Sequence, residues 1–305
     1  MISMKVLNYR HENSIKIGIL REPEQIVNLE HIISAMGKDL NLVEHDLSFI
    51  ENYYRLKPEL AAFLKQSSRE IKAMPISEVE ILAPVLHPSK IICLGLNYKD
   101  HAKETRQKLP RLPMLFAKAP TAILGMDGTI IIPQVHKSKE KNPRPIQFID
   151  YEVELAIIMG QKCKGVFIED AQNYILGYTI LNDVSARMEQ IADKQFFRSK
   201  SFDTFAPLGP WIVTSDEIGD PMNLNIECRV NGEIMQASNT RNMNFSVFEI
   251  VSFISEAITL LPGDIIGTGT PPGVGAAQKP PRSLRPGDMV EMNIENIGTL
   301  RNKVR

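Results

Sequence analysis

Three acidic side chains stand in the five-residue segment DYEVE, at residues 150–154, immediately before the apolar run LAIIMG. In an extended strand over residues 150–158, residues two apart point to the same face, so Glu152 and Glu154 are expected to project together. Two carboxylates about 4 Å apart repel each other by roughly 4 kcal/mol at an effective dielectric constant near 20. A shared proton, a neighbouring cationic side chain or a bound cation offsets that repulsion. The alternative is a solvated strand face that carries two ordinary glutamates.

Another acid ends a second apolar stretch of the chain. In LGYTILNDVSAR, Asp183 follows a strand-like run at the point where a helix is predicted to begin. It can cap that helix, or it can act as a third ligand beside Glu152 and Glu154. Three carboxylates favour a hard divalent ion, so the expected cofactor is Mg²⁺, with Mn²⁺ or Ca²⁺ as alternatives.

A histidine–glutamate pair and a lysine have types that suit proton transfer and charge stabilisation. NYKDHAKE places His101 and Glu104 three residues apart, on one face of a helical turn. A carboxylate orients a neighbouring imidazole and raises its basicity, as in a general base. Lys200, in SKSFDTFAPLGP, precedes an apolar segment, and an ammonium group there can stabilise a developing enolate. The ordinary alternative for both is a solvated surface role.

The elements that must position these residues lie mostly in a β-rich region. From about residue 81, short apolar or alternating runs are bounded by Gly, Pro, Asn and Asp, which is typical of strands joined by turns. The Asn-Gly pair in RVNGEI predicts a hairpin. FSVFEIVSFISEAITLL predicts a helix that ends at Pro262-Gly263, and SARMEQIADKQ predicts another.

Two loops of this region are distinctive. The polar segment QVHKSKEKNPRP, at residues 134–145, is predicted to be an exposed loop or insertion. GTGTPPGVG has no GKS or GKT, and its proline pair cannot open a helix as a dinucleotide-binding motif requires. We expect it to form a tight loop that presents backbone amides and Thr270 to a ligand, with a plain turn as the alternative.

Residues 1–80 carry no chemical motif. They combine the strand-like runs SIKIGIL and EQIVNL with the helical stretch DLSFIENYYRLKPELAAFLKQS, in which Phe49, Ile50, Tyr53 and Tyr54 recur at helical spacing. These side chains are expected to be core residues. Pro58 is predicted to divide the stretch into two helices. We therefore expect a small α/β N-terminal domain over 1–80 and a catalytic domain over 81–305.

Composition excludes several classes of protein. The 305 residues include 35 Lys and Arg against 36 Asp and Glu, which argues against a protein that tracks nucleic-acid phosphates. Three widely spaced cysteines without a CxxC motif predict free thiols rather than disulfides or a zinc site. The chain shows no signal-peptide pattern and no apolar run of the ~20 residues that a membrane helix needs, so a soluble cytoplasmic protein is expected.

The motifs together resemble those of the fumarylacetoacetate hydrolase superfamily. NYKDHAKE, FAKAPTAI, DYEVELAIIMG, GYTILNDVSAR, KSFDTFAPLGPWIVT, RVNGEIMQ and LLPGDIIGTGTPPGVG occur in the family's order over about residues 84–300. The resemblance implies a mainly β (α+β) fold, a mixed β-sandwich roll that pairs as a homodimer. Residues 1–80 resemble the variable N-terminal domain of its longer members, and the 134–145 loop is longer than in compact members.

The resemblance also assigns residues. Its metal triad matches Glu152, Glu154 and Asp183, its His-Glu dyad matches His101 and Glu104, and the lysine that contacts the substrate's oxo group matches Lys200. The positions that contact the outer part of the substrate match Arg187, Gln190, Lys118 and Thr270. Asp150 lies outside the triad, and we expect a β-edge or surface role for it.

The function expected from this site is a metal-dependent hydrolase or lyase of small 2-oxo or 2,4-dioxo acids, which cleaves a C–C bond of an acylpyruvate or diketo acid through a stabilised enolate. An oxaloacetate tautomerase or decarboxylase, or a 2-oxo acid isomerase, is the alternative at the same site. The alternative from another class is a non-catalytic metal- and ligand-binding domain. Such a domain has no use for His101, Glu104 and Lys200 together, so their joint presence favours an enzyme.

Overall fold

Two β-sheets form the framework of the fold. A computed structural model describes residues 4–21, 24–67, 71–135 and 144–305. The larger sheet has 12 strands, with the order β4-β3-β2-β1-β16-β14-β13-β19-β6-β7 and with β5 and β8 paired to β1 and β16. Its strands are β1 Lys5–His11, β2 Ser14–Arg21, β3 Gln25–Asn28, β4 Ala73–Pro75, β5 Glu80–Ile81, β6 Ile91–Gly95, β7 Met114–Lys118, β8 Ile123–Leu124, β13 Val153–Met159, β14 Ile175–Asn182, β16 Ala206–Thr214 and β19 Ile265–Gly267.

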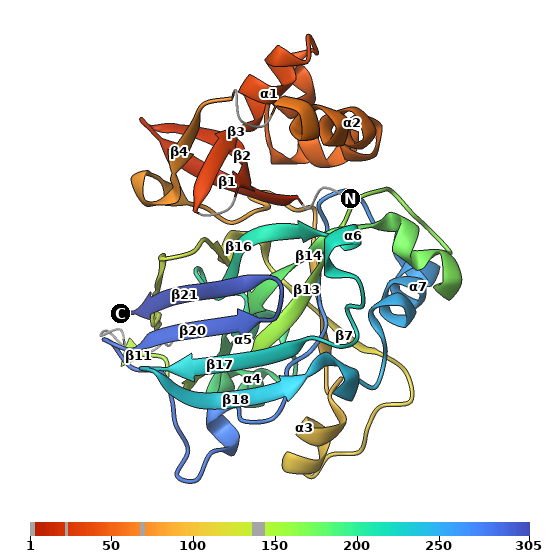
Figure 1. Ribbon diagram of the computed structural model, residues 1–305. Helices are drawn as coiled ribbons and strands as arrows, with labels where there is room; N and C mark the ends of the chain where they lie inside the picture. The colour runs from red at the N-terminus through yellow and green to blue at the C-terminus, as the bar shows by residue number, and fades with distance from the viewer. Residues whose placement is uncertain (1–3, 22–23, 68–70, 136–143) are drawn as a thin grey trace.

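A five-stranded sheet packs against the larger one and makes a sandwich (Figure 1). Its order is β18-β17-β20-β21-β9. The strands are β9 Thr129–Ile130, β17 Asn225–Val230, β18 Glu233–Asn239, β20 Met289–Ile294 and β21 Gly298–Val304. One face of β13, with Leu155 and Ile157, shares a buried apolar cluster with Ile226 of β17 and Met292 of β20. The mainly β, α+β architecture expected from the sequence is therefore confirmed.

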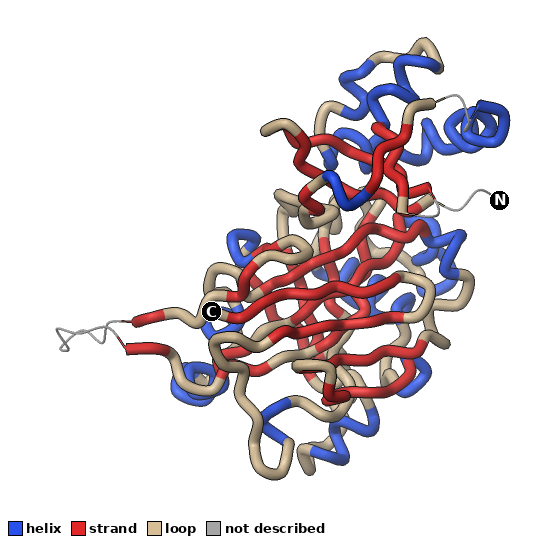
Figure 2. The backbone as a smooth tube through the Cα atoms, turned by 60° about the vertical axis from the view of Figure 1, so that its left-hand side comes forward, coloured by secondary structure: helices blue, strands red, loops and turns tan. Residues whose placement is uncertain are grey.

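Helices lie outside the sheets, as Figure 2 shows. The α-helices are α1 Leu29–Ala35, α2 Asp46–Ser67, α3 Lys99–Glu104, α4 Arg187–Asp193, α5 Phe197–Lys200, α6 Ser215–Ile218 and α7 Val247–Ala257. Short 3₁₀ turns are η1 Leu40–Val43, η2 Ile76–Glu78, η3 Pro120–Ala122, η4 Ile168–Tyr174, η5 Thr240–Asn242 and η6 Gly275–Ala277. None of the helices in the described residues has the length and apolarity that crossing a bilayer requires.

The N-terminal region joins the larger sheet directly, because β1 pairs with β16 in antiparallel register. Its helix α2 shares a second apolar cluster with the other face of β13, which carries Ala156 and Ile158. The Tyr54 hydroxyl also donates to the carbonyl of Ile175 in β14, at 2.9 Å. The division at residue 80 remains a proposal, since one sheet and one apolar cluster run across it.

The prediction that Pro58 splits the helical stretch is wrong, because α2 is continuous from Asp46 to Ser67. Proline removes one backbone hydrogen bond and crowds the preceding turn. Here Tyr53, Leu56 and Leu60, on both sides of Pro58, are no more than 1% exposed. Burial of about 1.5–3 kcal/mol per large apolar side chain offsets the cost of the proline.

Other local predictions were confirmed or shifted. The Asn-Gly pair forms the β17–β18 hairpin, with Asn231 and Gly232 at φ 54° and 81°, as a primed turn requires. Helix α7 begins with a reciprocal capping box between Ser246 and Glu249 but ends at Ala257, earlier than predicted. Ile258 is already extended, and Leu260 pairs with Cys163. All three cysteines are free and buried, as expected.

The acidic segment folds differently from the predicted strand over 150–158. It forms a short strand β12, Ile149–Asp150, and then β13 from Val153. β12 pairs with β15, Ser185–Ala186, whereas β13 pairs with β14. The break between them leaves Glu152 outside both strands. Strands β10, Gln134–Val135, and β11, Arg144–Pro145, pair at the base of the predicted 134–145 loop, whose residues 136–143 lie outside the described residues.

Candidate active site

A cavity of about 590 Å³ opens where the end of β6, helices α3 to α5 and the 270–277 loop meet. Seven of the residues singled out in the sequence line it: His101, Glu104, Glu152, Arg187, Gln190, Lys200 and Thr270. Glu154, Asp183 and Lys118 are buried and do not line the cavity. The cavity therefore has an accessible layer of polar groups with a deeper layer of charged groups behind it.

Lys200 connects the two layers. Its ammonium group donates to Glu152 Oε2 at 2.8 Å and also makes a short contact with Asp183 Oδ2. Asp183 Oδ1 accepts from Lys118 Nζ at 2.6 Å, and Lys118 also donates to the carbonyl of Val184 at 3.3 Å. Asp183 does not cap helix α4, whose N-cap is Ala186. Its carboxylate instead lies between two buried lysines.

These contacts separate the acid strengths of the two glutamates. Burial raises the pKa of Glu152, but the charges of Lys200 and Arg187 outweigh it and hold the pKa well below the usual range. Burial raises the pKa of Glu154 well above its usual value, and the negative charges of Asp183 and Glu152 raise it further. Burial lowers the pKa of Lys200, but Asp183 and Glu152 outweigh that effect, so Lys200 stays protonated. Among the described residues, Glu154 is the one of these carboxyl groups that forms no ion pair with a lysine or arginine, although the charge of Lys200 acts on it.

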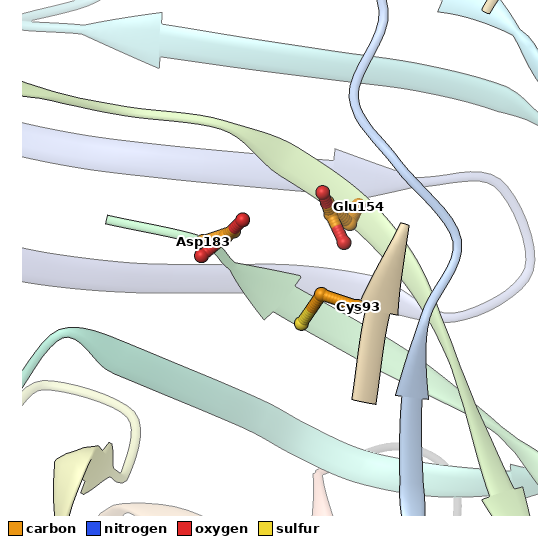
Figure 3. Close-up of side chains that lie close together, drawn as sticks. All are labelled: Cys93, Glu154 and Asp183. Carbon is orange, nitrogen blue, oxygen red and sulfur yellow. The ribbon is translucent and has the colours of Figure 1, made fainter. Parts of the chain in front are cut away.

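The deeper acids fit a hard divalent cation. Both oxygens of Glu154 are buried without a hydrogen-bond partner in the described part of the chain. Ligand atoms of Glu154, Asp183 and Cys93 lie within 4.8 Å of one another; Figure 3 shows them arriving from β13, from the end of β14 and from β6. Gly267 makes room for the carboxylate of Glu154 itself, since a Cβ there would lie 2.4 Å from Glu154 Oε2. A buried carboxylate without a hydrogen-bond partner, beside a second acid, suits a cation site.

The predicted dyad is formed. Helix α3 brings His101 Nδ1 to 3.1 Å from Glu104 Oε2, and Glu104 also accepts from the amide of Gly273, at 3.0 Å to Oε1. When Nδ1–H donates to this carboxylate, the lone pair of Nε2 is left available as a base. His101 is 8% exposed and lines the cavity.

Arg187, at the start of α4, is held at three points. Its Nε donates to Asp150 Oδ2 at 2.8 Å, its Nη2 lies 2.5 Å from Glu152 Oε1, and its Nη1 donates to Gln190 Oε1 at 3.2 Å. Burial lowers the pKa of Arg187, but Glu152 and Asp150 outweigh it and raise the pKa. The guanidinium is therefore a fixed positive charge at the cavity wall.

Apolar side chains also line the cavity. They are Leu94, Met114, Phe116, Ile191 and Phe196. The rings of Phe116 and Phe196 meet edge to face, with centroids 5.3 Å apart, and Lys200 Nζ lies 4.9 Å from the Phe116 centroid. Apolar side chains with a few placed polar groups are the usual lining of a small-molecule site.

Sequence reasoning missed two residues. Asp150 was expected at an edge or surface, but it is fully buried and bonded to Arg187. Its spacing of two from Glu152 was the available signal. Cys93 lies beside Glu154 and Asp183 although nothing in KIICLGL marks it.

Thr270, which the sequence analysis had singled out, is positioned by two hydrogen bonds: it donates to the carbonyl of Val153 at 3.0 Å and accepts from Gln236 Nε2 at 2.8 Å.

The cavity, the acids and the dyad lie in the region that matches a family model. Residues 90–305 match the model described as fumarylacetoacetate (FAA) hydrolase, C-terminal. The chain belongs to the fumarylacetoacetate hydrolase family. The matched range includes every residue that lines the cavity. The chain is therefore an enzyme of this family.

Relatives and solved structures agree with that membership. The chain is 42% identical to the mitochondrial oxaloacetate tautomerase Fahd2a of Rattus norvegicus over 93% of this chain and 88% of that protein. It is similar to the structure of a fumarylacetoacetate hydrolase from psychrophilic Exiguobacterium antarcticum, with a TM-score of 0.80, 35% identity and 99% of both chains covered. It is also similar to the maleylpyruvate hydrolase of Sphingobium sp. SYK-6 in complex with manganese(II) and pyruvate, with a TM-score of 0.78 and 27% identity over 99% and 98% of the two chains.

Proposed function

We propose that this fumarylacetoacetate hydrolase-family enzyme is a divalent-metal-dependent tautomerase that interconverts the keto and enol forms of oxaloacetate or a closely related 2-oxo acid. The observation that carries the proposal is that His101 and Lys200, a base and a fixed ammonium group, line the same cavity. The similarity to an oxaloacetate tautomerase over 93% of the chain supports the choice of substrate.

We assign the cation to Glu154, Asp183 and Glu152, with Mg²⁺ or Mn²⁺ as the ion. Oxygen donors suit hard ions, and burial raises the pKa of the Cys93 thiol well above its usual value, so Cys93 stays a neutral neighbour. The structure of the maleylpyruvate hydrolase with manganese(II) and pyruvate supports an ion and a 2-oxo acid in this kind of cavity. When bound, such an ion supplies Lewis acidity to a 2-oxo carbonyl.

The chain's own residues then move the proton. His101 Nε2 takes a proton from carbon 3, and the electron pair of that C–H bond becomes the C2=C3 double bond. The negative charge passes to the oxygen on carbon 2, where the third N–H of Lys200, beyond those to Glu152 and Asp183, stabilises it. The proton held by His101 then passes to that oxygen, which completes the enol and restores the base, so the reaction needs no co-substrate. Glu104 keeps the imidazole oriented throughout.

Arg187 and Gln190 are proposed to bind the outer carboxylate of the substrate. Arg187 carries five donors, and its contacts with Asp150, Glu152 and Gln190 leave others free to face the cavity. Thr270 lies at the same cavity wall. These contacts extend the polar layer beyond the reacting carbons.

Hydrolysis of an acylpyruvate is the second candidate, supported by the likeness to the maleylpyruvate hydrolase. The same enolate forms when a C–C bond breaks, and His101 then activates water instead of taking a carbon-bound proton. The apolar lining with Met114 and Phe196 is suited to an acyl group.

A spectrophotometric comparison tests the proposal. Enol decay of oxaloacetate and cleavage of acylpyruvates are followed with Mg²⁺ or Mn²⁺, and then with EDTA. Each rate is compared with the rate of the same reaction in the presence of the metal ion without protein. We expect metal-dependent acceleration of keto–enol exchange that His101→Asn removes, with the exposed His31→Asn as the matched control. If the protein accelerates acylpyruvate cleavage but not keto–enol exchange, the hydrolase is selected. If it accelerates neither reaction, both candidate functions are contradicted.

A further inference from the structure

Asp150 is a fully buried carboxylate that bonds to two walls of the cavity at once. On one side its Oδ1 accepts from the amide of Gly275 at 2.6 Å, and its Oδ2 accepts from the amide of Ala276 at 3.0 Å. On the other side its Oδ2 accepts from Arg187 Nε at 2.8 Å. Asp150 itself does not line the cavity.

The loop that Asp150 holds also holds the dyad. The amide of Gly273 donates to both oxygens of Glu104, at 3.0 and 3.2 Å, and Glu104 contacts His101. Gly273 is closely packed: its φ is +101°, and a Cβ there would lie 2.0 Å from the carbonyl oxygen of Met235. Val274, Ala276 and Ala277 of this loop line the cavity. The loop over 273–277 is therefore a strap between Asp150 at one end and Glu104 at the other.

Arg187 carries the second connection. With Nε on Asp150 and Nη2 on Glu152, the planar guanidinium is fixed in orientation at the cavity wall. One buried carboxylate thus fixes both a cationic wall and the strap behind the dyad. A shift of about 1 Å in such groups is enough to lower turnover about 100-fold.

We propose that Asp150 is a positioning residue of the reaction, which sets the geometry of the Glu104–His101 dyad through the 273–277 strap and that of Glu152 through Arg187. This rests on the proposed function for its kinetic consequence. It adds to that function a residue that touches neither the substrate nor the cation. The connection of Asp150 to the strap stands on the structure alone.

A purely structural role is the competing explanation, and Asp264 provides the matched control. Asp264 is also fully buried and is similarly bonded: it accepts from Ser89 Oγ at 2.5 Å and from the amide of Leu261 at 2.7 Å, and it lies 2.5 Å from Lys90 Nζ. None of these groups lines the cavity. Loss of its charge removes comparable bonds without touching the strap.

The experiment compares Asp150→Asn with Asp264→Asn in the full chain. Asparagine keeps the size of the side chain but places a donor against groups that already donate. For Asp150→Asn we expect kcat/KM on the 2-oxo acid that the wild type turns over to fall about 100-fold, mostly in kcat. Amide hydrogen exchange over 273–278 should accelerate in the same variant. For Asp264→Asn we expect a lower Tm, with kcat/KM and the exchange of that segment unchanged.

The outcomes separate cleanly. Wild-type kinetics and wild-type exchange in Asp150→Asn, or an equal loss of kcat in Asp264→Asn at matched loss of Tm, would overturn the proposal. Where asparagine is not tolerated, Asp150→Ser removes the charge and some bulk, and the same criteria apply. If the wild type turns over no 2-oxo acid, the proposed function fails. The exchange comparison over 273–278 still decides whether Asp150 holds the strap.

Discussion

The carboxylate of Glu154 lies within 4.8 Å of that of Asp183, yet only Asp183 is paired. Asp183 accepts from Lys118 and Lys200, whereas neither oxygen of Glu154 has a partner in the described residues. An unpaired buried acid costs folding free energy that a bound cation recovers. The metal-free protein is therefore held below the stability that its packing allows.

The first prediction concerns Glu154→Gln. Glu154 has a raised pKa in the folded chain, so above the unfolded value of 4.5 the folded state binds more protons and stability falls as pH rises. Without metal, the variant should be more stable than the wild type, by about 1 kcal/mol at neutral pH, because the folded wild type must keep Glu154 protonated where the unfolded chain is ionised, whereas the amide needs no proton. Its advantage should disappear near pH 4.5. Urea unfolding in EDTA from pH 4.5 to 8 measures this, and a variant less stable at every pH would contradict it.

In added Mn²⁺ the order should reverse. Ligand binding stabilises the folded state by RT ln(1 + [L]/Kd), and the variant lacks one ligand. The Tm of the wild type should rise with Mn²⁺ concentration, and that of Glu154→Gln should rise much less. Equal shifts in the two proteins would remove Glu154 from the cation site.

The second prediction identifies the remaining ligand. Two side chains are candidates beside Glu154 and Asp183: Glu152, at the cavity, and Cys93, on β6. Because a hard ion prefers oxygen, Glu152→Gln should weaken Mn²⁺ binding about 100-fold, whereas Cys93→Ser should leave it within about threefold. Calorimetric titration of both variants makes the comparison. The reverse order would place the ion deeper, against the thiol.

How far the sequence alone reaches can be judged from single residues. Local patterns sufficed for the Asn231-Gly232 hairpin and for the dyad on α3, because neighbouring residues decide turn type and helical spacing. They failed at Pro58, where burial of flanking side chains outweighs a local rule. Cys93 could not have been predicted beside Glu154, because only the parallel pairing of β6 with β19 brings it there.

The acidic segment shows the same limit. A period of two predicted that Glu152 and Glu154 share a strand face, but the chain breaks between β12 and β13. Besides the amide of the adjacent Tyr151, the amides that donate to Asp150 are those of Gly275 and Ala276, more than a hundred residues away. Residue types alone suggested a cation site in this segment, which stays a prediction, whereas the geometry of the segment depends on long-range contacts.

The third prediction separates the two members of the dyad. Glu104→Gln keeps a side chain that can accept from Gly273 but removes the charge that orients His101. We expect kcat to fall about 10–100-fold, less than for His101→Asn, which removes the base and should cost about 100–10,000-fold. Mn²⁺ affinity should stay close to that of the wild type in both. A larger loss for Glu104→Gln than for His101→Asn would make the carboxylate, not the imidazole, the base.

The fourth prediction concerns Lys118, which the family resemblance matches to a substrate-contacting position. In the structure its side chain is 1% exposed, lies outside the cavity lining and donates to Asp183 and to the carbonyl of Val184. Lys118→Met keeps the length and the packing but leaves Asp183 with Lys200 alone. Removal of one partner of a buried ion pair costs about 3–5 kcal/mol, so the metal-free variant should unfold at much lower urea concentration. Its KM should change by no more than about twofold. A side chain that does not contact the substrate contributes no binding energy whose loss would raise KM. A KM that rises more than tenfold, in a variant of wild-type stability, would show instead that Lys118 reaches the substrate.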